Sequence, residues 1–388
     1  MRKTNTWWWR TLLVGGLGIG SVAVSAQEPA RKGWVGRQVD KFLRDTLPPS
    51  RPRFLVYPTL AYAPETSLEL GVSSLFLYHA KNNVAQNRLS EVNTFVFFTL
   101  RSQYGLALDN NLYGDADRWL LLGRIRFQRF PLLYYGIGPE NSGREPAEVD
   151  ATYLQVRQRV LGKIIPNLFG GLGVDFQRLS RVSFNQPDSD AYAVPPGAGG
   201  TSNLGLGPAL VFDNRHNPLN VREGLYVELA ALKYSPRWGS NFNFQQFLFD
   251  VRSYRPVGAN RRQVLASQIY GSYTTGSTVP FHHLSLMGGE MLQRGFYAGR
   301  YRDQAYLAGQ VEFRMLPFPF SKRFGGAVFA SAGAVAPTPG ELAWKNVQPT
   351  GGLGLRYLLF PKKDVFLRFD AGFTREGPGF YIFTGEAF

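Results

Sequence analysis

The feature that most constrains the fold is a two-residue alternation of polar and apolar side chains, which runs from residue 53 to the C-terminus. In DQAYLAGQVEFRM, residues 303–315, Glu312 and Arg314 fall on one face and Val311 and Phe313 on the other. Successive side chains of a β-strand point to opposite faces, so this pattern predicts a strand with one polar and one apolar face.

About sixteen such segments lie between residues 53 and 388, which leaves roughly 21 residues for each segment. That spacing suits strands of about ten residues with their connections. Two all-β architectures use this pattern. A soluble sandwich buries its apolar faces inside, whereas an outer-membrane barrel turns them towards lipid. Periodicity alone does not separate the two.

The N-terminus favours export. Arg2, Lys3 and Arg10 precede or flank a short apolar stretch, and the small residues of VSA end at Ala26. This arrangement predicts a signal peptide over residues 1–26. Its apolar stretch is shorter than the ~20 residues that a membrane-spanning helix needs.

Aromatic residues and sheet edges favour the barrel. Tyrosine and phenylalanine gather near strand ends, as in LYHA and FYIF, where interfacial girdles lie in outer-membrane barrels, and the chain ends at Phe388. Closure also removes the exposed edges of a large sheet. We therefore expect a sixteen-stranded antiparallel barrel over residues 53–388, in the bacterial outer membrane and in contact with its lipid.

In this register the lumen is cationic. The inward arginines are Arg101, Arg124, Arg126, Arg157, Arg159, Arg252, Arg314, Arg356 and Arg368. The inward acids are Glu69, Asp175, Glu228, Asp250, Glu312 and Asp370. Nucleic-acid binding needs basic residues on an outer surface, so no nucleic-acid partner is expected.

Residues 27–52 do not follow the alternation. Val35, Val39, Phe42 and Leu43 share one stripe of a helix, and prolines follow it. We expect a short amphipathic helix in a periplasmic or interfacial extension, which is too short for a domain of its own.

Two motifs resemble the BamA/TamA superfamily of outer-membrane assembly and translocation barrels, also called bacterial surface antigens. The first is LVFDNRHNPLNVREGLYVEL, residues 210–229, and the second is GGEMLQRGFYAGRYRDQAYLAGQVEFRMLPF, residues 288–318. The matching residues are Asp213, Arg215, Asn217, Pro218 and Gly224 in the first, and Gly288, Gly289, Arg294, Gly295, Phe296 and Glu312 in the second. The resemblance covers about residues 53–388.

The resemblance implies that a long extracellular loop folds into the lumen and that its Arg-Gly-Phe tip binds acids on the inner wall. Arg294 would be that arginine, Gly295 would allow the tight reversal, and Phe296 would wedge the tip. Glu312 would be one wall acid. Ser331 stands where the family has a second acid, and Asp370 is the expected substitute.

Relatives also carry periplasmic POTRA domains, for which residues 27–52 leave no room, so the chain resembles a short form of the family. Catalysis is not expected. The four histidines, His79, His216, His282 and His283, lack the spacing of a metal site, and no cofactor motif is present.

Pro58 falls inside the first strand, where proline removes a ladder hydrogen bond. It marks either a weakened seam between the first strand and the last, near Tyr381 and Phe388, or a bend near a strand end. The expected function is assembly or translocation of outer-membrane components, with unfolded outer-membrane proteins and periplasmic accessory proteins as partners. A passive channel plugged by the loop, or a structural anchor for a periplasmic partner, are the alternatives.

Overall fold

The computed structural model describes residues 51–99, 102–129, 131–141, 145–187, 192–215, 217, 219–258, 261–361 and 364–388. The expected signal peptide, the expected helix within residues 31–50 and Arg101 lie outside these ranges. None of the helices in the described ranges is long and apolar enough to cross a membrane.

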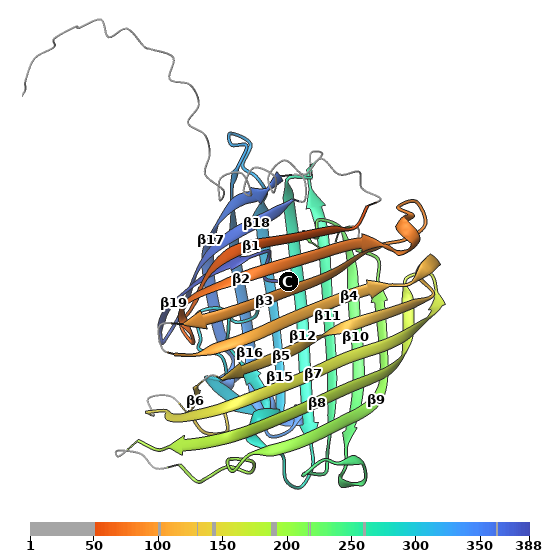
Figure 1. Cartoon of the computed structure of the whole chain (residues 1–388). Coiled ribbons are helices and arrows are strands. Elements are labelled where there is room, and N and C mark those ends of the chain that lie inside the picture. The colour runs from red at the N-terminus through yellow and green to blue at the C-terminus, as the bar shows by residue number, and fades with distance from the viewer. Residues whose placement is uncertain are drawn as a thin grey trace, which may run out of the picture. The chain divides into compact units, whose positions relative to one another are not determined.

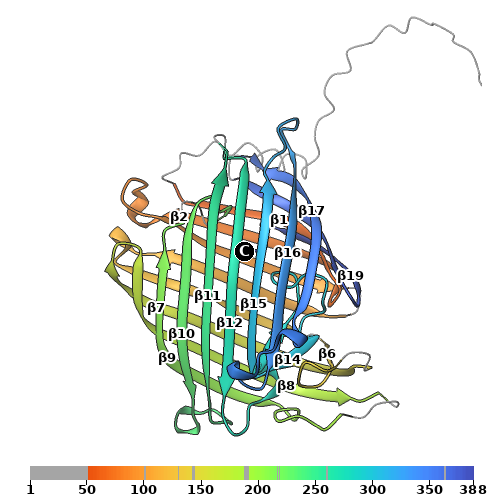
Figure 2. The ribbon, with the colours of Figure 1, turned by 180° about the vertical axis from the view of Figure 1, so that it is seen from behind.

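Sixteen antiparallel strands close into a barrel, which confirms the predicted fold class (Figures 1 and 2). They are β1 (Arg53–Ala63), β2 (Ser67–His79), β3 (Leu89–Thr99), β4 (Tyr104–Tyr113), β5 (Trp119–Arg129), β7 (Ala147–Ile165), β8 (Leu168–Asn185), β9 (Thr201–Asp213), β10 (Gly224–Tyr234), β11 (Phe244–Val257), β12 (Gln263–Thr275), β15 (Ala305–Met315), β16 (Phe324–Ala336), β17 (Gln348–Phe360), β18 (Val365–Thr374) and β19 (Gly377–Thr384). The short β6 (Leu132–Tyr134) adds to the edge of β7, and β13 (Ser285–Met287) pairs with β14 (Tyr301–Asp303) outside the barrel sheet.

The two faces of the wall follow the alternation. Val328 on β16 and Leu353 on β17 are 53% and 60% exposed on the outside, whereas Arg314, Arg356 and Arg368 are fully buried inside. An apolar outside and a polar inside are what a barrel in lipid requires, and away from the rims and from the contact of β1 with β19 the backbone groups of the wall can pair between strands.

The two rims differ in the length of their connections. Residues 130–146, 186–200, 276–304 and 337–347 connect strands at one rim, and mostly short turns such as 166–167 and 258–262 connect them at the other. Outer-membrane barrels place short turns in the periplasm and long loops outside the cell. The rim with the long loops is therefore the extracellular one.

The seam where β1 meets β19 is the weakest strand contact in the wall. In the described residues the register joins Tyr62 to Ile382 and no other pair, whereas β1 and β2 pair along all of Arg53–Ala63. Pro58 lies on the outward face of β1 opposite Val72. β19 ends at Thr384, so it does not follow β1 to the periplasmic rim.

Candidate functional site

The loop at residues 276–304, between β12 and β15, folds back into the lumen. Its β13–β14 pair forms a short hairpin, and the tip between the two strands carries four glycines with positive φ. These are Gly288 at +104°, Gly289 at +114°, Gly295 at +112° and Gly299 at +79°. Such values disfavour other residues, which explains why the glycines recur in this stretch.

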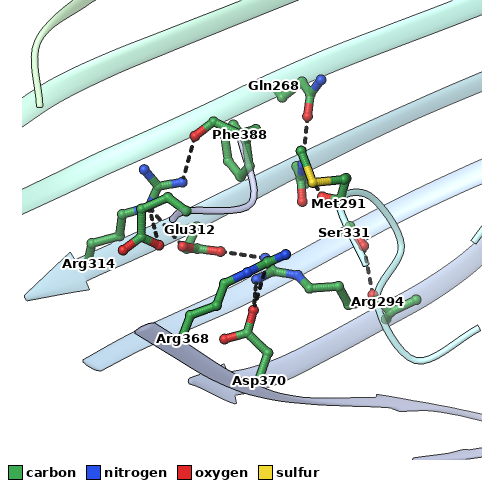
Figure 3. Close-up of polar contacts among 12 residues, drawn as sticks. Gln268, Met291, Arg294, Glu312, Arg314, Ser331, Arg368, Asp370 and Phe388 are labelled. Carbon is green, nitrogen blue, oxygen red and sulfur yellow. Dashed lines mark hydrogen bonds and ion pairs between the residues drawn. The ribbon is translucent and has the colours of Figure 1, made fainter. Parts of the chain in front are cut away.

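Arg294 joins the tip to the barrel wall (Figure 3). Its guanidinium binds Glu312 on β15 and lies 2.5 Å from Asp370 Oδ2 on β18. The guanidinium carbon also lies 3.5 Å from the ring centroid of Phe329 on β16. Arg294 is only 1% exposed, so it is held by two carboxylates and an aromatic face away from bulk water.

The two carboxylates are shared with three further arginines of the wall. Glu312 also binds Arg314 at 2.8 Å and Arg356 at 3.2 Å. Asp370 also binds Arg356 at 2.5 Å and Arg368 at 3.2 Å. The tip therefore enters a network in which every buried charge has an opposite partner, the arrangement that burial of charge demands.

Glycines on both sides let the tip backbone approach the wall. The N–H of Gly295 donates to the hydroxyl of Tyr381 on β19 at 2.9 Å. A Cβ on Gly295 would lie 2.6 Å from the Thr374 side chain, and one on Gly372 would lie 2.5 Å from the Arg294 carbonyl oxygen. Side chains at either position would push the tip away.

Phe296 packs on the opposite side of the tip. It is 1% exposed and lies in an apolar cluster with Met287, Tyr301, Tyr306 and Val335. Its ring meets that of Tyr301 edge-on at 5.7 Å. Burying an aromatic ring in this cluster contributes hydrophobic stabilisation that does not depend on the ion pairs.

The other two arginines of the loop bind neighbouring extracellular loops. Arg300 lies 2.5 Å from Glu376, in the turn between β18 and β19, and donates to the Asn141 carbonyl oxygen. Arg302 donates to the Leu133 carbonyl oxygen and lies over the Tyr134 ring. These two arginines therefore join the loop to two other extracellular connections, the one between β5 and β7 and the one between β18 and β19.

The chain's last four residues also enter the lumen. The chain turns at Gly385, with φ +90°, and Glu386 then lies 2.9 Å from Arg356. Phe388 packs in a buried cluster with Val221, Tyr254, Val264, Ala266 and Ala387. Its main-chain oxygen accepts a hydrogen bond from Arg314. The C-terminal tail, Gly385–Phe388, thus shares Arg314 and Arg356 with the loop tip, and Phe388 lies inside the barrel instead of along the seam.

The first motif lies at the periplasmic rim, far along the wall from the tip. Asp213 ends β9 and binds Arg215 through two hydrogen bonds of 2.9 and 2.8 Å. Arg215 stacks on Tyr226, and Gly224, with φ +123°, leaves no room for a Cβ beside the Arg215 backbone. Asn217 accepts a hydrogen bond from the N–H of Leu219, and Pro218 lies outside the described residues. The motif orders a turn.

Between the tip and the tail, the lumen encloses a cavity of about 650 Å³. Its lining carries charges of both signs, among them Arg124, Arg157, Asp109, Glu228 and Asp250. In the described part of the chain, no group of three or more histidine, aspartate or glutamate side chains is placed to hold a metal ion.

The alternation predicts which side chains face the lumen, but it does not predict which of these side chains contact one another. Arg314, Arg356 and Arg368 were expected in the lumen without a link to the loop, and Glu386 and Phe329 were not singled out. Ser331 does not take the role of an acid: its hydroxyl lies 2.7 Å from that of Thr350. The inward arginines outnumber the inward acids in the sequence. This excess was the one signal that a further acid, here Glu386, enters the lumen.

Comparison with known proteins agrees with this geometry. Residues 97–359 match the Omp85 superfamily domain. The fold resembles BamA from Haemophilus ducreyi lacking POTRA domains 1-3, with a TM-score of 0.55 and 15% identity over 86% of this chain and 70% of that one. It also resembles CdiB from Acinetobacter baumannii, with a TM-score of 0.54 and 12% identity over 85% of this chain and 59% of that one.

CdiB from Escherichia coli is similar as well, with a TM-score of 0.52 and 10% identity over 90% of this chain and 69% of that chain. No curated protein sequence matches the chain significantly. Identities this low establish the fold alone, whereas the family match covers more than half of the chain. The chain therefore belongs to the Omp85 superfamily of bacterial outer-membrane β-barrels.

Proposed function

We propose that this barrel assists the insertion or translocation of outer-membrane components without catalysing a reaction. The seam between β1 and β19 would be the route, and the lumen loop would be a latch that holds the barrel wall in place. Unfolded outer-membrane proteins would be its clients and periplasmic proteins its accessory partners. The observation that carries the proposal is the single register pair, Tyr62 with Ile382, that closes the barrel.

The sequence on both sides of the seam disfavours its extension. If the register continued, Glu386 would lie opposite Pro58, on the same outward face as Ile382. Pro58 cannot donate a ladder hydrogen bond, and a carboxylate facing lipid is unfavourable. The inward turn at Gly385 instead gives Glu386 its partner Arg356. An incompletely paired edge is a surface to which another strand can add.

The latch supports the same proposal. Arg294 contacts β15, β16 and β18, and Gly295 contacts β19, so the tip spans the wall next to the seam. Release of the tip would remove hydrogen bonds and ion pairs from β18 and β19 together. That links the loop's position to the mobility of the seam.

The test uses a chain without native cysteine. Tyr62→Cys with Ile382→Cys places a disulfide across the seam. The purified barrel in liposomes is then assayed for accelerating the insertion of an unfolded client barrel. We expect acceleration only after reduction. The matched control is Leu210→Cys with Leu229→Cys, which are register partners on the outward face of β9 and β10. It should be active whether oxidised or reduced.

Acceleration by the oxidised seam pair would exclude the seam as the route. Absence of acceleration in every state would favour the second candidate, a plugged channel, which the charged lumen cavity supports. Conductance in planar bilayers after deletion of residues 288–302 tests that candidate directly. A plugged channel should gain a large steady conductance, whereas an assembly factor should lose client insertion.

A further inference from the structure

On the outward face of the barrel, cations lie at one common height towards the extracellular rim. They occupy only part of the circumference. Arg129 on β5 and Lys233 on β10 lie at or next to the extracellular ends of their strands, and Arg178 lies in the extracellular half of the longer β8. Each is an even number of residues from an exposed apolar residue on its own strand: Phe127, Leu172 and Leu229. They therefore point outward, where the barrel meets the membrane.

Their height matches the edge of the hydrocarbon layer. Arg129 and Arg178 lie ten residues beyond Trp119 and Leu168, the first residues of β5 and β8 at the periplasmic rim. Ten residues of a strand tilted by about 40° rise roughly 25 Å, which is about the thickness of the apolar band of an outer-membrane barrel. Lys233 lies nine residues beyond Gly224, the first residue of β10, so all three cations lie at the level of the outer-leaflet headgroups.

The cations are confined to the β5–β10 part of the wall. On the outward faces of the other described strands, the residues nearest the extracellular loops are apolar or uncharged, such as Phe98, Tyr273 and Phe373, except for Glu148 and Asp150 on β7. Elsewhere these positions therefore carry no cation, and the outward cations at this height gather between β5 and β10.

Most of these cations lack a protein partner. Arg129 lies 3.0 Å from Asp150, but Arg178 and Lys233 have no ion pair within the described ranges. Two more exposed arginines stand beside them, Arg181 on β8 and Arg237 in the loop after β10. We call Arg129, Arg178, Arg181, Lys233 and Arg237 the cationic sector.

We propose that the cationic sector binds the phosphate groups of lipid headgroups in the outer leaflet. Lysine and arginine at the hydrocarbon boundary keep their stems in the apolar layer and their charges among the headgroups. Phosphate oxygens accept charge-assisted hydrogen bonds from them. Trp238, 37% exposed and bonded through its indole N–H to the Leu204 carbonyl oxygen, adds an interfacial ring beside Arg237. The surface is independent of the seam and the latch.

The experiment measures lipid binding by native mass spectrometry of the full barrel released from detergent micelles. The probe is diphosphoryl lipid A, and monophosphoryl lipid A is the comparison. We expect the diphosphoryl lipid to bind more tightly. Arg178→Gln with Lys233→Gln should weaken its binding by roughly fivefold for each cation removed. Arg178→Lys with Lys233→Arg, which keeps both charges, should bind nearly as the unaltered chain does.

The matched control removes two exposed cations at the periplasmic rim, Arg118→Gln with Lys322→Gln, and should leave binding unchanged. A heat-dependent gel shift like that of the unaltered chain establishes that each variant is folded. Equal binding of the two lipids, equal losses in the control and the sector variant, or no loss in the sector variant would each overturn the proposal.

Discussion

At the scale of single residues, charge balance in the lumen network decides which substitution is most harmful. Four arginine side chains, Arg294, Arg314, Arg356 and Arg368, face three acidic side chains, Glu312, Asp370 and Glu386. Removing Arg294 leaves three charged side chains of each sign, and both Glu312 and Asp370 keep arginine partners. Removing the Glu312 charge leaves four cationic and two anionic side chains, and deprives three arginines of a shared partner.

We therefore predict that Arg294→Gln lowers barrel stability by about 1–3 kcal/mol, and that Glu312→Gln lowers it by about 3–5 kcal/mol. Sheet content should stay intact in both. The temperature at which the folded band is lost on unboiled gels measures the order of the two effects. Equal midpoints, or a larger loss in Arg294→Gln, would contradict the balance argument.

Between elements, the contact of the loop tip with β18 depends on shape as much as on charge. Gly372→Ala would place a methyl group 2.5 Å from the Arg294 carbonyl oxygen, so we expect the tip to be displaced with all charges retained. Gly351→Ala on β17 is the control, because its Cβ would meet its nearest neighbour at an ordinary 3.6 Å. Faster hydrogen exchange over residues 288–300 in the first variant alone is the expected result.

The same loop is tied to the turn between β1 and β2 through a titratable group. The N–H of Ala298 donates to Glu65 Oε1 at 2.6 Å. Burial, with smaller contributions from Glu290 and Glu69, raises the pKa of Glu65 from 4.5 to about 7, although hydrogen bonds to its carboxylate oppose the shift. A raised pKa means that the protonated carboxyl is favoured when the loop is closed.

Loop closure should therefore be strongest below about pH 4.5 and should weaken as pH rises through about 7, by at most roughly 3 kcal/mol. Hydrogen exchange of residues 295–300, corrected for the intrinsic rate at each pH, measures this. Glu65→Gln should remove the dependence, and Glu341→Gln, on the exposed loop between β16 and β17, should not. Weaker closure at low pH would show that the sign is wrong.

For the whole molecule, the sequence predicts the wall better than it predicts what fills it. Two-residue alternation assigns each side chain to a face, so the sixteen strands and the inward Arg314 and Arg368 could be predicted. The alternation carries no information on distances across the lumen. The contact of Arg294 with Phe329 could therefore not be predicted from it. Alternation also places Glu386 on the lipid face if β19 continues, and only the turn at Gly385 brings it inside.

The C-terminal tail, Gly385–Phe388, can lie in the lumen or can extend β19 along β1 in the wall. It cannot occupy both positions at once. Glu386→Gln removes the ion pair with Arg356 and makes an outward position less unfavourable, so we predict that the tail then extends β19 along β1 more often. In that register Ala387 faces Tyr57, and a Tyr57→Cys, Ala387→Cys pair reports the extended state. Disulfide yield should rise severalfold with Glu386→Gln and should stay low with Glu386→Asp, which keeps the charge. An equal yield in both would mean that Glu386 does not hold the tail, and that packing of Phe388 against Tyr254 and Val264 does.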